Sequence, residues 1–291
     1  MERQVRVLLA WLDRAEAISM LLGHVPGPND DIAAQVATWE AARNAMLASE
    51  PYTRPTPVLE EVPPELSERA QAFRQRPDVV SVFQNLEWTV GIVDLRTLLS
   101  FQKVVVEEQA VERVSGASAD DLNALFSLCL PEPGGNVTLN AIIDHDQKGI
   151  TFSSLNPNLR VVGHVIQEME VWPAAGQPGQ KMKFVGFAIN FGVRFVQLAE
   201  YNDRWFVRDG YHRCYGLLRQ EINRIPCVFI RAHNIQELGA QAPGFFNYEV
   251  LFGDRPPFLT DFLDDSVSVF ARQRATRKVV RVTAEEFVVE V

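Results

Sequence analysis

The sequence predicts an α+β protein, and three features of the 291-residue chain support this fold class. Apolar residues recur at helical spacing near the beginning, whereas between Asn136 and Val207 they alternate with polar residues, as in half-buried strands. From Trp205 to Leu218 the letters WFVRDGYHRCYGLL indicate a strand that passes through a glycine turn into a helix. Since 47% of the residues are hydrophobic, the chain can also bury a sizeable core.

The first expected module, residues 1–64, is an α-helical hairpin followed by a connector. Its first helix is predicted from apolar residues at helical spacing, namely Val5, Leu8, Leu9, Leu12, Ile18 and Leu22. Its second helix is predicted from capping residues that precede an apolar stripe, namely Asn29, Asp30 and Asp31, then Ile32, Val36, Trp39 and Met46. Five prolines between Pro51 and Pro64 interrupt regular structure, so we expect a surface connector there and a module boundary.

The second expected module, residues 65–240, contains short helices and then most of the strands. Its expected elements are helices at Leu66–Phe73 and Val79–Phe83, a strand at Val90–Val93, and the runs NVTLNAII, NLRVVGHVIQEMEVW, KMKFVGFAINFGVRFVQLAE and RWFV. The strands between 136 and 207 belong either to the core of this module or to a separate sheet. The segment Pro173–Gln180 predicts a hairpin tip, and Asn202 with Asp203 predicts a tight turn.

The third expected module, residues 241–291, is a C-terminal extension that packs on the core. It begins with a loop containing Pro243 and Gly244 and ends with VVRVTAEEFVVEV, which predicts a closing strand.

The charge of the chain limits the kinds of partner that it attracts. A net charge of −9 and a pI near 5.2 count against a protein that coats DNA, but they leave room for a local cationic groove. The segment RQRATRK, Arg272 to Lys278, is either the solvated end of a helix or part of such a groove. Other cations near the glycine turn are Arg204, Arg208, Arg219 and Arg224.

Cysteine usage and hydropathy predict a cytoplasmic protein. Cys129, Cys214 and Cys227 are odd in number and lack the spacing of zinc ligands, which favours a reducing compartment and no structural zinc. We expect no membrane partner, signal peptide or anchor, because charged residues interrupt MERQVRVLLAWLDRAE and no apolar run is long enough to span a bilayer.

The strand–turn–helix segment predicts an anion site. Gly210 permits the turn, and the first amides of the following helix have no intrahelical acceptors. His212 and Arg213 add a titratable group and a fork of donors that suits phosphate or carboxylate. We therefore expect Gly210, His212 and Arg213 to line an accessible cleft. The alternative is an ordinary strand–glycine–helix connection with a solvated arginine.

These residues also resemble a known superfamily. DGYHR, from Asp209 to Arg213, followed by CYGLL and IPCVFI, looks like the DGHHR or DGQHR segment of the ParB/sulfiredoxin superfamily. VGIVDLRTLLSFQKVV, which contains Gln102, is similar to the opening strand and turn of ParB-like domains, where the corresponding Gln lines the pocket. The resemblance implies a ParB/sulfiredoxin-like α/β core, with an extended mixed or antiparallel sheet and an N-terminal helical segment. It also implies a phosphate site made by Gly210, Arg213 and Gln102.

Two activities of that superfamily are not expected here. Sulfiredoxins carry their reactive cysteine where Tyr211 stands, so this chain is not expected to repair oxidised peroxiredoxins. Cys214 is expected to be a small apolar residue on the buried face of a helix. Chromosome-partitioning members continue into a helix-turn-helix, for which the sequence downstream gives no indication.

The resemblance implies an enzyme directed at DNA or a nucleotide, because relatives with DGQHR-like motifs occur in bacterial DNA modification, restriction and phage defence. We expect hydrolysis of a phosphodiester, a nucleotide or a base–sugar bond, which includes DNA glycosylase activity. In this interpretation Arg213 grips phosphate, Asp209 or Asp144 orients water or Mg²⁺, His212 moves a proton, and Tyr211 stacks on a flipped base. The alternatives are a kinase that transfers phosphate from ATP or ADP to a small molecule, and a noncatalytic nucleotide-binding module.

Two acidic groups in the sequence have side chains suited to a metal ion. Asp144 and Asp146 lie on one face of a strand and could share a metal ion or a water, although a hairpin turn explains IIDHDQKG equally well. Asp261, Asp264 and Asp265 predict a solvated acidic face, with a metal site as the alternative.

Overall fold

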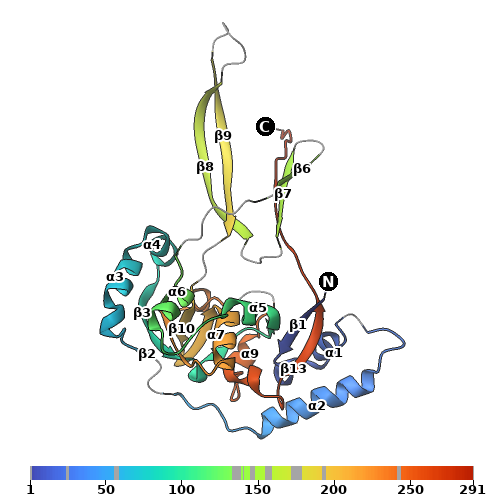
Figure 1. Ribbon diagram of the computed structural model, residues 1–291. Helices are drawn as coiled ribbons and strands as arrows, with labels where there is room; N and C mark the ends of the chain where they lie inside the picture. Colours follow the sequence, from blue (N-terminus) through green and yellow to red (C-terminus); the bar gives the residue numbers. More distant parts are fainter. Residues whose placement is uncertain are drawn as a thin grey trace. The chain divides into compact units, whose positions relative to one another are not determined.

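The protein is a mixed α+β structure, as the periodicities predicted (Figure 1). The computed structural model describes residues 2–23, 26–55, 59–132, 139, 141–144, 148–154, 159–171, 179–191, 195–240 and 244–290. The chain divides into two compact units, of which unit 1 comprises Met1–Glu132 and Arg194–Arg274 and unit 2 comprises Pro133–Val193 and Ala275–Val291. The module boundaries expected after residues 64 and 240 both fall inside unit 1.

A three-stranded antiparallel sheet opens unit 1, where the sequence had predicted a helix. Its strands are, in order across the sheet, β13 (Val269–Arg274), β1 (Glu2–Val7) and β5 (Val104–Val106). Strand β1 forms because it has a partner on each side, and Val5 and Val7 point into the core. The helical prediction for this stretch is therefore wrong, and so is a helix end at Arg272–Arg274, which lie in β13.

The expected helical pair begins only after this strand. A 3-10 turn η1 (Leu9–Trp11) leads to α1 (Arg14–Leu22) and α2 (Ile32–Ala48). Asp13 and Asp31 accept hydrogen bonds from the amides of Glu16 and Ala34, which confirms capping by aspartate at the start of α2.

A six-stranded mixed sheet forms the centre of unit 1. Its strands are, in order across the sheet, β2 (Leu59–Glu60), β3 (Glu87–Asp94), β12 (Arg224–Arg231), β10 (Gln197–Tyr201), β11 (Arg204–Asp209) and β4 (Leu99–Ser100). The pairs β10–β12 and β11–β4 are parallel, and the other neighbours are antiparallel. Asn202 and Asp203 form the tight β10–β11 turn with positive φ angles, as predicted.

Helices complete the core of unit 1. They are η2 (Pro64–Leu66), α3 (Ser67–Gln75), α4 (Pro77–Phe83), η3 (Leu95–Thr97), α5 (Glu107–Arg113), α6 (Leu122–Cys129), α7 (Tyr211–Arg219), α8 (Ile235–Leu238), α9 (Tyr248–Leu251) and η4 (Leu259–Leu263). Helix α7 is buried along most of its length, and Cys214 is fully inside, as expected. At Gly216 the backbone of α5 comes so close that an added Cβ would lie 2.7 Å from the carbonyl oxygen of Ala110.

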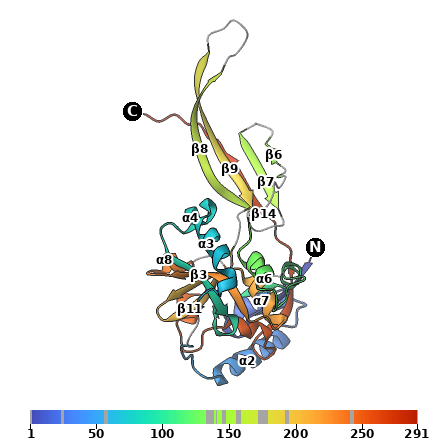
Figure 2. The ribbon, with the colours of Figure 1, turned by 60° about the vertical axis from the view of Figure 1, so that its left-hand side comes forward.

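The regular elements in the described residues of unit 2 are all strands. Three of them form an antiparallel sheet in the order β14 (Lys278–Thr283), β7 (Gly149–Ser154) and β6 (Ala141–Ile143). The other two, β8 (Leu159–Val171) and β9 (Gln180–Phe191), form a long antiparallel ribbon (Figure 2). Most of the alternating run that the sequence showed thus belongs to separate sheets. Most of the expected tip, Pro173–Gln180, lies outside the described residues, as do His145 and Asp146.

Candidate functional site

The turn between β11 and α7 has the strand–glycine–helix geometry that the sequence predicted. Gly210 has a φ of 95°, and an added Cβ would meet Cγ2 of Val196 at 3.0 Å, so glycine is required for both reasons. The amides of Arg213 and Cys214 donate to the Gly210 carbonyl at 2.9 and 3.0 Å, which starts the helix. The Gly210 amide donates to Oδ1 of Asp209 at 2.7 Å. The half-buried Asp209 carboxylate therefore lies directly at this turn.

Gln102 lies at the same edge of the sheet as this turn. Strand β4 runs parallel to β11, with Leu99 opposite Phe206 and Ser100 opposite Val207. The last paired residues are Ser100 and Val207, and Gln102 and Asp209 each come two residues later. Because the strands are parallel, both residues lie at the carboxyl-terminal edge of the sheet. The Gln102 side chain is half-buried, and its Nε2 donates to the Val104 carbonyl at 2.7 Å.

Tyr211 is a core residue and cannot hold a flipped base. Its side chain is 4% exposed, and its hydroxyl accepts a hydrogen bond from the Phe101 amide at 2.9 Å and donates to the Val207 carbonyl. Burial raises the pKa of the Tyr211 hydroxyl well above its usual range, so it stays a neutral donor. The tyrosine ties β11 to the segment after β4. The base-stacking prediction is not retained, because the ring is buried.

Arg213 also points inward, which changes the role expected for it. It is 6% exposed, and its Nη1 donates to the carbonyls of Leu128 at 2.8 Å and Cys129 at 3.3 Å. These carbonyls are at the end of α6, where backbone acceptors lack intrahelical donors. Arg213 thus joins α7 to α6. Because Gly210 is buried too, the expectation that both line an accessible cleft is corrected.

His212 differs from its neighbours in the DGYHR segment because solvent reaches it. It is half-buried in the first turn of α7, whereas the residues on both sides are buried. Asp209 is half-buried as well. His212 and Asp209 are therefore the two titratable side chains of the motif that are partly exposed, although solvent does not reach Nε2 of His212.

The four arginines that lie near the glycine turn in the sequence are each paired with groups of the protein. Arg208 donates to Oε1 of Gln197 at 2.5 Å and to the Glu237 carbonyl at 3.1 Å, and burial lowers its pKa. Arg204 lies over the Tyr52 ring at 4.6 Å and donates to the Leu251 carbonyl. Arg219 and Arg224 form ion pairs with Glu107 and Glu60.

Asp144 lies in unit 2, at the end of β6, and forms an ion pair with Arg281 of β14. This pairing crosses the three-stranded sheet beside Gly149, where an added Cβ would collide with the Asp144 carboxylate. A catalytic role for Asp144 stays a prediction.

The acidic residues after Phe258 have structural partners. Oδ2 of Asp261 accepts from the Phe258 amide at 2.7 Å, and Oδ1 of Asp265 pairs with Arg6 at 2.5 Å. Burial raises the pKa of Asp261 to about 7. Among the described residues, no group of three or more His, Cys, Asp or Glu is arranged to hold a metal ion.

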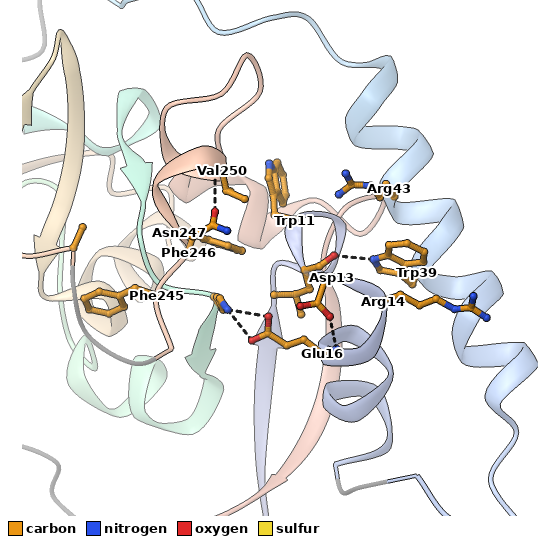
Figure 3. A pocket seen from close by; sticks show the side chains of 13 residues that line it. Trp11, Asp13, Arg14, Glu16, Trp39, Arg43, Phe245, Phe246, Asn247 and Val250 are labelled. Carbon is orange, nitrogen blue, oxygen red and sulfur yellow. Dashed lines mark hydrogen bonds and ion pairs between the residues drawn. The ribbon is translucent and has the colours of Figure 1, made fainter.

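The sequence did not predict a cavity that lies beside Lys103, the residue after Gln102 (Figure 3). It has a volume of about 660 Å³ and is lined by Trp11, Asp13, Glu16, Trp39 and Lys103, among others. Lys103 pairs with both carboxylate oxygens of Glu16 at 2.8 Å, and Nε1 of Trp39 donates to the Leu12 carbonyl at 3.0 Å. These polar groups of the cavity wall therefore bond to one another. None of the residues from Asp209 to Arg213 lines it. The sequence carried no signal for it, because its walls come from four distant segments.

No family model, no curated protein and no solved structure matches this chain. In the part of the chain that the structure describes, no helix has the length and apolar character needed to cross a bilayer.

Proposed function

We propose that unit 1 is a phosphate-binding domain of the ParB/sulfiredoxin type and that the protein is a hydrolase acting on DNA or a nucleotide. The observation that carries the proposal is the parallel pairing of β4 with β11. It brings Gln102 and the Asp209–Arg213 turn, two segments that separately resemble the superfamily, to one edge of the sheet. Ligands of open α/β sheets bind at the carboxyl ends of their strands, which is where these segments end.

Phosphate recognition in this site falls to the backbone and to two half-buried side chains. Arg213 is committed to the end of α6, so it cannot supply the charge. The positive end of the α7 dipole and the amides of its first turn favour an anion there. Gln102 and His212 retain exposure at this edge and can add donors.

Asp209 and His212 divide the chemistry in this proposal. His212 accepts the proton of the attacking water and, once protonated, donates it to the leaving group, while Asp209 orients the water or Mg²⁺. Because a phosphate beside the Asp209 carboxylate is repelled, a cation between them is needed. Mg²⁺ is commonly held by one or two carboxylates plus substrate oxygens, so Asp209 is the side chain that would hold it. Bound there, Mg²⁺ would neutralise phosphate charge.

The test compares the wild type with Asp209→Asn and His212→Gln on labelled single- and double-stranded oligodeoxynucleotides and on nucleoside triphosphates, with and without Mg²⁺. We expect each variant to lose about 100-fold or more in cleavage rate while its melting temperature stays within about 3 °C of wild type. His233→Gln is the matched control, since His233 is exposed on another segment of unit 1 and pairs with Glu87. It should cleave at the wild-type rate.

Binding measured at two salt concentrations separates the classes of function. Retention of DNA that falls with salt supports the proposal. Stabilisation by ATP or ADP with neither DNA binding nor hydrolysis of the nucleotide would favour the kinase or the noncatalytic module instead. Cleavage that survives in both site variants would refute the assignment of Asp209 and His212.

A further inference from the structure

The β8–β9 ribbon of unit 2, which we call the arm, exposes more apolar surface than a stable isolated structure can. Its sheet contains these two strands alone, running side by side from Leu159–Phe191 to Val171–Gln180 (Figures 1 and 2). Large apolar side chains along it are roughly half-exposed, namely Val161, Val165, Ile166, Met169, Met182, Phe184, Val185 and Phe187. A two-stranded ribbon is marginally stable in water, and contiguous exposed apolar surface marks an interaction site. The arm therefore needs a partner.

The register sorts the arm residues onto two faces that differ in charge. Residues directly opposite each other share a face, because side chains alternate along each strand. The first face, which we call the charged-tip face, carries the pairs His164–Phe187, Ile166–Val185, Glu168–Lys183 and Glu170–Lys181. The second face carries the pairs Gly163–Ala188, Val165–Gly186, Gln167–Phe184 and Met169–Met182. Of these two sets of pairs, the charged-tip face alone combines apolar residues with formal charges.

The charges of this face are segregated by strand. Both acids, Glu168 and Glu170, are on β8, and both bases, Lys181 and Lys183, are at the same levels on β9. If two arms stack face to face about a two-fold axis parallel to the strands, β8 of each copy lies over β9 of the other. Acid then meets base at every charged level, Ile166 of each copy meets Val185 of the other, and Phe187 meets His164.

The opposite orientation is unfavourable. An axis perpendicular to the strands would place the charged tip rows over Ile166, Val185 and Phe187, which are 49–66% exposed, and would bury charge against apolar surface. The pattern of this face is thus self-complementary in one arrangement.

We propose that the arm is a self-association surface whose partner is the charged-tip face of a second copy of this chain. The contact is isologous, so each copy supplies the same residues. A ribbon of this length covers roughly 40 Å by 10 Å, or about 400 Å² per copy. That is below the size of a standard stable interface, so we expect a reversible dimer with a dissociation constant on the order of 10–100 µM.

The mixed charges of the arm disfavour nucleic acid as its partner. Lys181 and Lys183 stand opposite Glu170 and Glu168 on the neighbouring strand, so these two bases form no continuous basic surface.

The test uses the full chain in sedimentation velocity from about 2 to 200 µM. Two variants each make the face a single sign: Glu168→Lys with Glu170→Lys, and Lys181→Glu with Lys183→Glu. We expect each alone to self-associate at least roughly 10-fold more weakly than the wild type, because like charges then face one another. An equimolar mixture of the two should form a heterodimer at least as tight as the wild-type dimer. Unfolded variants could not show this rescue.

The matched control changes the second face, with Met169→Gln and Met182→Gln, and should leave the dissociation constant within about 2-fold of wild type. The proposal is overturned if the wild type stays monomeric up to about 200 µM, including when it instead binds DNA or lipid vesicles through the arm. It is also overturned if mixing fails to restore association, or if the control weakens it as strongly as the charge variants do.

Discussion

Arg213 illustrates how the same residue type serves either a ligand or the fold. A guanidinium can meet a phosphate, but here it satisfies the carbonyls of Leu128 and Cys129 at the end of α6. Burying this charge is tolerated because the donors find fixed acceptors. The position of the side chain, rather than its chemistry, decides which role it has.

Arg213→Ala is therefore expected to destabilise the protein, not merely to inactivate it. Removing the guanidinium takes a donor from the part-buried Leu128 carbonyl and from the Cys129 carbonyl, which keeps the Val196 amide, at a cost of about 1–3 kcal/mol in the free energy of unfolding. Urea denaturation measures it. Arg96→Ala is the control, because Arg96 pairs with Asp94 at the exposed surface, and its removal should leave the free energy of unfolding nearly unchanged. If the Arg213→Ala protein has wild-type stability but has lost activity, the result would contradict this prediction and support a phosphate-binding role for Arg213.

Asp261 should make the stability of unit 1 depend on pH. Burial raises its folded-state pKa to about 7, above its ordinary value of 3.8, so the folded state binds the proton more tightly than the unfolded state. The stabilisation is fully present below about pH 4 and is lost as the pH rises towards 7. In Asp261→Asn the fall in unfolding free energy between about pH 4 and 8 should shrink by on the order of 1–3 kcal/mol. Denaturation of both proteins at several pH values measures this, and an unchanged slope would contradict the prediction.

At the scale of elements, helix α7 depends on a close approach to α5. Gly216 is the contact point, since a Cβ there would lie 2.7 Å from the Ala110 carbonyl oxygen and 2.9 Å from Cγ2 of Val114. Helix α7 begins directly after Gly210, so the contact between α5 and α7 also fixes the position of the Gly210 turn.

Gly216→Ala should destabilise the protein although alanine is the better helix former. The intrinsic gain is about 1 kcal/mol, but displacing the α5 backbone should cost more, for a net loss of about 1–2 kcal/mol. Urea unfolding measures the net effect. The double variant with Val114→Ala should be less unstable than the two single effects summed, because one of the two collisions is relieved. A stabilised Gly216→Ala protein would show that the helices move apart freely.

At the scale of the whole molecule, unit 2 is built from two chain segments, residues 133–193, which leave unit 1 and return to it, and residues 275–291, which follow it. The first exit and return lie close together, because the Val196 amide donates to the Cys129 carbonyl at 2.8 Å. The core of unit 1 contains its own sheets and helices. Unit 1 should therefore fold without unit 2.

A chain in which a short Gly/Ser linker replaces residues 133–193, and which ends at residue 274, should unfold in one cooperative transition. Circular dichroism and thermal denaturation measure this. If the proposed site in unit 1 is sufficient, the shortened chain should keep phosphate-ligand binding and should remain monomeric, since it lacks the arm. A folded product without binding would instead implicate unit 2, including Asp144.

The sequence by itself determined the features that depend on neighbouring residues. Asp31 before an apolar stripe predicted α2, Asn202–Asp203 predicted the β10–β11 turn, and the Trp205–Leu218 segment predicted β11, the Gly210 turn and α7. Alternation predicted most of the strands of unit 2. Caps, tight turns and periodicity depend on residues close together in the chain, so they can be predicted from the sequence alone.

Only the tertiary structure decided the partners of those elements and the direction of the site residues. Residues 2–7 form a strand because β5 and β13, far along the chain, flank them, and no local pattern records such neighbours. Tyr211 and Arg213 turned inward because Phe101 and the end of α6 offer hydrogen-bond partners there. The same side chains could equally have met a ligand. Long-range contacts determine which polar groups are buried and hydrogen-bonded, and residue spacing and composition do not predict those contacts.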